Sequence, residues 1–140
     1  MDKENKEFEK KIIEFNILDA RIRELEQNIV LLEKQITEIQ NCQLSLDELK
    51  NTKEGTETFS SISPGILVKS KLLDNSEVMM DVGAKIFCKK SVDGAKEIIQ
   101  KRLDQALEIH KKLSEEITLL LQEITKLEKE IREKQLKSIS

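Results

Sequence analysis

A heptad repeat in the first third of the chain limits what the chain can fold into. Apolar residues recur at position a, in residues 8, 15, 22, 29 and 36, and at position d, in residues 18, 25, 32, 39 and 46. Of the twelve a and d positions from 8 to 46, only Lys11 and Gln43 are polar. A period of 3.5 residues held over this length predicts a long helix that pairs with another helix in a coiled coil.

The last third of the chain carries a second ladder of the same kind. Ser91 is a predicted N-cap, and Asp93 in the first turn suits the positive end of the helix dipole. His110 is the polar exception among the a and d positions, which are Ile99, Leu103, Ala106, His110, Leu113, Ile117, Leu120, Ile124, Leu127 and Ile131. The pattern predicts a second coiled-coil helix.

Between the helices, short runs of strand-forming residues alternate with turn signals. The turn signals are Ser63-Pro64-Gly65, Asp74-Asn75-Ser76 and Gly83, and Gly83 is expected to have a positive φ. Gly55 is expected to end the first helix. We predict four strands, at about 57–62, 66–73, 77–82 and 85–90, which pair as two β-hairpins.

The expected fold is mostly α with a small β part: a long antiparallel two-helix coiled coil joined by two β-hairpins. The segments are a helix in 1–52, the hairpins in 53–91 and a helix in 92–140, within one domain overall. Helices of ~45 residues would each be roughly 65–70 Å long. The middle segment cannot easily span that length, so the helices should be antiparallel, with Phe8 near Gln135 and Leu46 near Glu97.

Composition and charge exclude several function classes. Basic and acidic residues number eight and twelve in 1–50, six and five in 51–92, and ten and ten in 93–140, so no segment has the basic excess of a nucleic-acid-binding protein. The longest apolar run, Ile29 to Leu32, is far shorter than the ~20 residues of a membrane span. Cys42 and Cys88 suit a reducing cytosol and are expected as small apolar side chains, not a disulfide.

The sequence shows no pattern typical of an enzyme. It has one histidine, no Cys-x-x-Cys, and no phosphate-binding loop, because Gly83-Ala84-Lys85 is too short for one. We therefore expect no active site, no metal and no cofactor. His110 could form a pH-sensitive seam or a ligand site, but a single polar residue that sets the helix register is the simpler interpretation.

Isolated hairpins are unstable, and their open strand edges would pair with other chains, so an oligomer is expected.

The order of one helix, two hairpins and a second helix resembles the α class of prefoldin subunits, whereas the β class has one hairpin. Residues 65–74, GILVKSKLLD, are similar to the family's Gly-x-x-Val-x-Ala-x-Leu/Ile-x-Asp, and residues 78–86, VMMDVGAKI, to its Val-x-Val-x-Val-Gly-x-Gly-hydrophobic signature. Ala95 also matches. The chain departs from the family at Ser61, where proline is usual (its own proline is Pro64), and at Lys85, where glycine is usual.

The resemblance implies a cytoplasmic, ATP-independent holdase. Two α-class and four β-class subunits would form a hexamer, with the hairpins joined into β-barrels. The coiled-coil ends would hold non-native chains and pass them to a group II chaperonin. The resemblance implies no nucleotide or metal, and neither nucleic acid nor a membrane is expected as a partner. The residues expected in subunit assembly are Phe59, Ile62, Ile66, Val68, Leu72, Val78, Met80, Val82, Gly83 and Ile86.

Apolar residues near both chain ends are candidates for client binding, and several fall outside the a and d positions. The candidates are Phe8, Ile12, Ile13, Phe15, Ile17, Leu127, Ile131, Leu136 and Ile139. They could instead widen the seam or pack on a neighbouring subunit. Two alternative functions stay open: a homo-oligomeric or filament-forming scaffold without a client, and a scaffold subunit that binds a folded partner.

Overall fold

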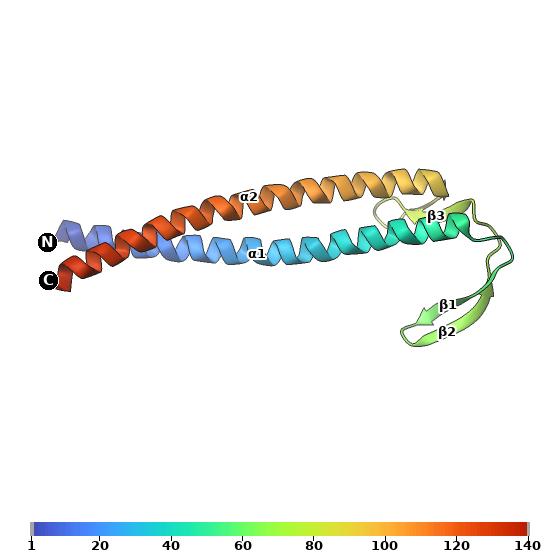
Figure 1. Ribbon diagram of the computed structural model, residues 1–140, viewed down its shortest axis with the longest axis horizontal. Helices are drawn as coiled ribbons and strands as arrows, with labels where there is room; N and C mark the ends of the chain where they lie inside the picture. Colours follow the sequence, from blue (N-terminus) through green and yellow to red (C-terminus); the bar gives the residue numbers. More distant parts are fainter. Residues whose placement is uncertain (1, 140) are drawn as a thin grey trace. The chain divides into compact units, whose positions relative to one another are not determined.

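The computed structural model describes the backbone of residues 2–139 and the side chains of residues 2–137. Two long helices and two antiparallel hairpins confirm the predicted fold class (Figure 1). The elements are α1 (Asp2–Asn51), β1 (Glu57–Ser63), β2 (Ile66–Lys71), β3 (Glu77–Asp81), β4 (Phe87–Ser91) and α2 (Val92–Ile139). The chain divides into two units: a terminal unit, with residues up to Gln35 and from Ala106 on, and a central unit, Ile36–Gln105.

In the terminal unit, α1 and α2 run side by side in opposite directions, with the chain ends together (Figure 1). The buried side chains all occupy predicted a and d positions, and they are Ile22, Leu25, Leu32, Ala106, Ile124 and Leu127. The polar d residue Lys11 is half-buried, and its Nζ lies 3.2 Å from Oε2 of Glu130. The buried seam therefore follows the predicted heptad, and its polar residue Lys11 forms an ion pair with the opposite helix.

The central unit has its own apolar core where the helices meet the second hairpin. Leu46 of α1 packs with Val92, Ala95 and Ile99 of α2, as the predicted antiparallel pairing requires. The half-buried side chains against this cluster are Ile39, Cys42, Leu49, Val78 and Met80. Cys42 and Cys88 are half-buried free thiols in the described chain, as predicted.

The hairpin β3–β4 rests on this core through one face. Its register runs from Glu77 opposite Ser91 to Asp81 opposite Phe87. Side chains of successive strand residues point to opposite faces. Val78 and Met80 therefore face the helices, while Met79 between them is exposed. Nη2 of Arg102 on α2 also donates to the carbonyl oxygen of Asp81, at 3.0 Å.

The hairpin β1–β2 is held mainly by its own ladder. Its strands pair from Glu57 opposite Lys71 to Ser63 opposite Ile66, with a bulge between Ser61 and Ser63. The two-residue loop contains Pro64 and Gly65, and φ of Gly65 is +84°. A proline followed by a residue with positive φ is typical of a type II turn.

Two strand boundaries differ from the prediction by two residues, and the other ends of the helices and strands by one at most. Helix α1 ends at Asn51, one residue before the predicted bound of 52, and Gly55 lies beyond its end, where its amide donates to the Leu72 carbonyl, at 2.6 Å. The Leu72 amide still donates to the Thr56 carbonyl, at 3.0 Å, but the regular pairing of β2 ends at Lys71 rather than at 73. Strand β4 begins at Phe87 rather than at 85, because the preceding residues form a tight turn.

The start of α2 matches the predicted cap. The Gly94 amide donates to Oγ of Ser91, at 3.0 Å, which satisfies one of the free amides of the first turn. Nζ of Lys50, in the last turn of α1, donates to Oδ1 of Asp93, at 2.7 Å. This hydrogen bond and the attraction to Lys50 hold the pKa of Asp93 below its usual value.

Candidate assembly and client-binding surfaces

The outer face of β3–β4 is uncovered and carries two large apolar side chains among charged ones. Met79 and Phe87 are exposed on the face opposite the helices, and Val82 and Ile86 are exposed in the connecting turn. In the described chain, β3 and β4 form a sheet of only two strands. The hairpin therefore offers both exposed apolar side chains and open strand edges, the two features that promote pairing with another chain.

The hairpin β1–β2 is still more exposed. Neither of its strands contains a buried side chain. Its exposed apolar residues are Phe59, Ile62, Ile66, Leu67 and Val68. Leu73, which follows β2, has 86% of its surface exposed. So many exposed apolar side chains on one small hairpin are typical of a surface that another chain covers.

The residues predicted for assembly fall into two groups. Phe59, Ile62, Ile66, Val68, Val82, Gly83 and Ile86 are exposed. Val78 and Met80 instead pack against the helices of their own chain, and Leu72 is half-buried. Met79 and Phe87, which are also exposed, were not among the residues predicted for assembly. The strict alternation of side chains along β3 would have identified Met79, once it was known which face the helices cover.

The turn between β3 and β4 has unusual backbone geometry. Ala84 and Lys85 have φ values of 51° and 60°, and Gly83 has the predicted positive φ, at 132°. The Ile86 amide donates to the Gly83 carbonyl, at 2.9 Å. Positive φ at both central residues is typical of a type I′ turn, which favours glycine or asparagine. The position of Lys85 is thus one where glycine would be less strained.

The apolar residues near the chain ends also divide in two. Ile12, Ile13, Ile17 and Leu136 are exposed. Phe8, Phe15 and Ile131 are half-buried in the seam, and Leu127 is buried in it. Leu127 is therefore inaccessible while the helices stay paired. The side chain of Ile139 lies outside the part of the chain whose side chains are described.

An ion pair joins the two helices beside these exposed residues. Nη2 of Arg21 lies 3.3 Å from Oε1 of Glu116, and Nη1 of the same guanidinium lies 3.3 Å from Oε2 of Glu24. Hydrogen bonds to these two carboxylates raise the pKa of Arg21 further above its usual value. The positive charge of Arg21 is therefore balanced by two carboxylates of the same chain.

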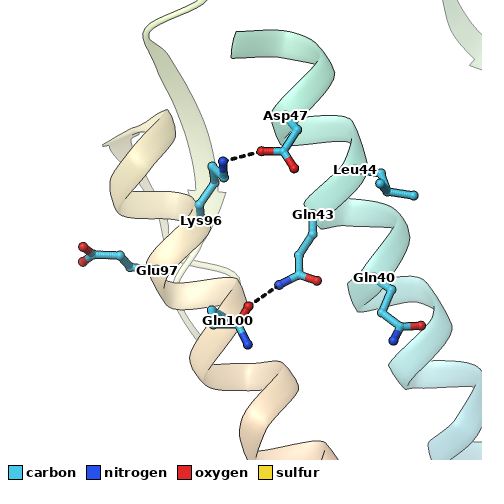
Figure 2. A pocket seen from close by; sticks show the side chains of 7 residues that line it. All are labelled: Gln40, Gln43, Leu44, Asp47, Lys96, Glu97 and Gln100. Carbon is cyan, nitrogen blue, oxygen red and sulfur yellow. Dashed lines mark hydrogen bonds and ion pairs between the residues drawn. The ribbon is translucent and has the colours of Figure 1, made fainter. Parts of the chain in front are cut away.

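Polar side chains line the groove between the helices in the central unit, and they form a hydrogen bond and an ion pair across it. Figure 2 shows Gln43 bonded to Gln100, with Nε2 and Oε1 2.7 Å apart, and Lys96 paired with Asp47. Gln43 is the second polar residue of the α1 seam, and it too has a partner on α2.

Among the described side chains, no three His, Cys, Asp or Glu residues gather as metal ligands would. No helix within the described range is both long enough and apolar enough to span a bilayer.

The family model and the similar proteins agree on one family. A family model described as "Prefoldin subunit" matches residues 18–137. The chain is 29% identical over 139 residues to "Prefoldin subunit alpha" of Pyrococcus horikoshii, covering 96% of this chain and 94% of that protein. It is 30% identical over 105 residues to "Prefoldin subunit alpha 1" of Thermococcus kodakarensis, covering 75% of this chain and 72% of that protein.

A solved structure shows the same fold. The chain superimposes on the cryo-EM structure of filamentous PFD from Methanocaldococcus jannaschii with a TM-score of 0.73 and 23% sequence identity. The match covers 82% of this chain and 95% of that one. At this level of identity the likeness concerns the arrangement of helices and hairpins.

Proposed function

The chain belongs to the prefoldin family as an α-class subunit, and we propose that it serves a hexameric, ATP-independent chaperone that holds non-native polypeptides. Members of this family are chaperones, not enzymes. In the proposed hexamer, two copies of this chain join four β-class subunits. The observation that carries this proposal is the set of uncovered apolar side chains on the two hairpins, which in a single chain would promote aggregation.

Assembly is proposed to use the outer surfaces of the hairpins. Met79 and Phe87 supply apolar contacts on β3–β4, and the exposed strands of β1–β2 supply others. Pairing of open edges with the hairpins of β-class subunits would satisfy the edge amides and carbonyls. Val78 and Met80 have a different role in this proposal, because they fix β3–β4 to the helices of the same chain.

Client capture is proposed to use exposed aliphatic residues near the chain ends. Ile12, Ile13, Ile17 and Leu136 are accessible in the paired helices. A few such side chains bind weakly on their own. Several copies in one hexamer would act together and raise the overall affinity by avidity. Family membership supports the further proposal that the hexamer acts in the cytoplasm and passes its client to a group II chaperonin.

A truncation tests the capture step. We would delete residues 1–17 and 127–140, assemble the shortened chain with its β-class partner, and follow the aggregation of guanidinium-denatured citrate synthase by light scattering. The expected result is an intact hexamer that no longer suppresses aggregation. Full suppression by an intact truncated hexamer would show that the chain ends do not bind the client.

A further inference from the structure

We propose that Asn75, in the linker between the two hairpins, is a positioning residue for assembly. Its side chain fastens the base of β1–β2 to the end of α1, so that a partner subunit meets both hairpins in one fixed arrangement. The bond that carries this inference runs from Nδ2 of Asn75 to the carbonyl oxygen of Thr52, at 2.9 Å, within the central unit. The inference rests on the proposed assembly through the hairpins.

Thr52 is a firm point of attachment for this side chain. It directly follows the last residue of α1, and its amide donates to the Leu49 carbonyl, at 3.2 Å. Its hydroxyl donates to the Glu48 carbonyl, at 2.6 Å, so it satisfies a carbonyl group at the helix end. Because α1 has ended, the carbonyl of Thr52 itself accepts from Asn75 instead of from a later turn. Both residues are half-buried, which strengthens the hydrogen bond between them.

Packing does not fix β1–β2 against the rest of the central unit. Neither of its strands contains a buried side chain, and Leu73, which follows β2, is almost fully exposed. The hairpin β3–β4, by contrast, is held by Val78 and Met80, which pack against the core of the helices. The arrangement of β1–β2 therefore depends on hydrogen bonds at its base.

Two kinds of hydrogen bond are found at that base. The Gly55 amide donates to the Leu72 carbonyl, and the Leu72 amide donates to the Thr56 carbonyl. These two bonds continue the pairing of the hairpin, so they would move with it. The bond from Asn75 to Thr52 lies beyond them and ties the linker to the helix end. It closes the segment that contains the hairpin into a loop, which restricts the hairpin's motion.

The linker is also fixed on the side of α2. Oδ1 of Asp74 accepts from the hydroxyl of Ser76, at 2.6 Å, and from its amide, at 2.7 Å. These hydrogen bonds hold the pKa of Asp74 below its usual value. The Ser76 carbonyl accepts from the amide of Val92, the first residue of α2, at 2.9 Å. Asn75 therefore joins the end of α1 to a turn that is itself bonded to the start of α2.

A hairpin that is fixed before association should bind its partner more tightly. A partner that contacts both hairpins binds only chains in which the two have the matching arrangement, so the measured affinity falls with the fraction of such chains. Preorganisation of this kind lowers the ordering cost of association. The loss of one hydrogen bond is enough to change such a fraction several-fold.

The variants Asn75→Ala and Asn75→Asp test the proposal in the full chain. Both remove the amide N–H that donates to Thr52, and the second keeps the size of the side chain. The matched controls are Asn41→Ala and Asn41→Asp, at an exposed position of α1 in the central unit. Each chain is titrated with a β-class prefoldin subunit on a sizing column, and its folded fraction is measured by circular dichroism.

We expect both Asn75 variants to bind the β-class subunit several-fold more weakly at an unchanged folded fraction, and both controls to match the unmodified protein. Amide hydrogen exchange in residues 52–56 and 72–76 of the purified chain should also become faster in the Asn75 variants. This second measurement reports on the base of β1–β2 and needs no partner.

The other outcomes separate this inference from the assembly on which it rests. Unchanged affinity in Asn75→Ala, or full affinity in Asn75→Asp, would overturn the positioning role and leave the proposed assembly standing. Binding that weakens only in proportion to a lower folded fraction would show that Asn75 supports the fold alone, which also overturns the inference. An unmodified chain that binds no β-class subunit would reject the assembly itself, and the positioning role with it.

Discussion

Nε2 of His110 lies 3.1 Å from Oε1 of Glu33, across the seam of the terminal unit. His110 is the polar member of the α2 ladder, and it is half-buried where the other ladder residues are apolar. A single polar seam residue usually specifies register at some cost in stability. The contact with Glu33 supports this role for His110.

Replacing His110 with leucine should stabilise the helix pair. The substitution His110→Leu would bury additional apolar surface at a seam position, and the expected gain in the free energy of unfolding is about 1 kcal/mol. Thermal unfolding followed by circular dichroism measures it. The control Glu108→Leu, at an exposed position of the same helix, should change stability little. A loss of stability in His110→Leu would mean that the contact with Glu33 outweighs apolar burial.

Glycine in the β3–β4 turn should also stabilise the protein. Ala84 and Lys85 have positive φ values, which cost a residue with a Cβ about 1 kcal/mol relative to glycine. Ala84→Gly and Lys85→Gly should therefore each raise the melting temperature. The reverse change, Gly65→Ala at φ +84°, should lower it. Equal melting temperatures for all three variants would contradict the turn geometry.

Replacement by alanine should cost far more stability at Leu46 than at Leu44. Leu46 is 9% exposed in the core of the central unit, whereas Leu44 is 63% exposed. Leu46→Ala leaves a cavity and should cost about 2–5 kcal/mol. Leu44→Ala should stay within about 0.5 kcal/mol of the unmodified protein. Denaturant unfolding of both variants checks the placement of the core, which fails if the two costs are similar.

The pair of Lys50 and Asp93 should make stability depend on pH at both extremes. The pKa of Asp93 is lowered from its ordinary value of 3.8, so its stabilisation is complete above that value and is lost as pH falls through the lower folded pKa. The pKa of Lys50 is raised from 10.5, so its contribution is complete below that value and is lost as pH rises through the higher folded pKa.

Asp93→Asn tests this pH dependence. The variant should melt below the unmodified protein at neutral pH, and the difference should shrink once the pH is well below 3.8. Because both side chains are exposed, the effect should be small and should weaken in salt. A difference in melting temperature that stays constant from neutral to strongly acidic pH would rule out the ion pair as its cause.

Charge on the outer face of β3–β4 should block assembly without unfolding the chain. Met79→Glu and Phe87→Glu place carboxylates on the exposed face, where burial by a partner would be costly. We expect each variant to keep its helix content and to lose association with β-class subunits on a sizing column. Lys111→Glu, at an exposed position of α2 in the terminal unit, controls for a change of charge alone. Normal assembly of both apolar variants would place the interface elsewhere.

The helices were predictable because their pattern is local and long. Every a and d residue from Phe8 to Leu46 is buried or half-buried in the structure. The antiparallel register also followed from the sequence, since Leu46 packs near the start of α2 as expected. The cap at Ser91 has a short-range signal in its side chain, and its hydrogen bond to Gly94 is present.

The surfaces were less predictable because they depend on contacts distant in sequence. Met79 and Met80 look alike in the sequence, and only the position of the helices decides which one is exposed. Leu127 fits both a client site and a seam, and its burial shows that it belongs to the seam. Ala84 and Lys85 carry no residue signal for positive φ, so β4 was expected to begin too early.

The most direct test of the assignment is the mass of the assembly. The purified chain would be measured alone, and again after mixing with a β-class prefoldin subunit, by light scattering on a sizing column. We expect a shift to a defined hexamer with two copies of this chain and four of the partner. A large self-assembly whose mass ignores the partner would contradict it and would favour a homo-oligomeric or filament-forming scaffold.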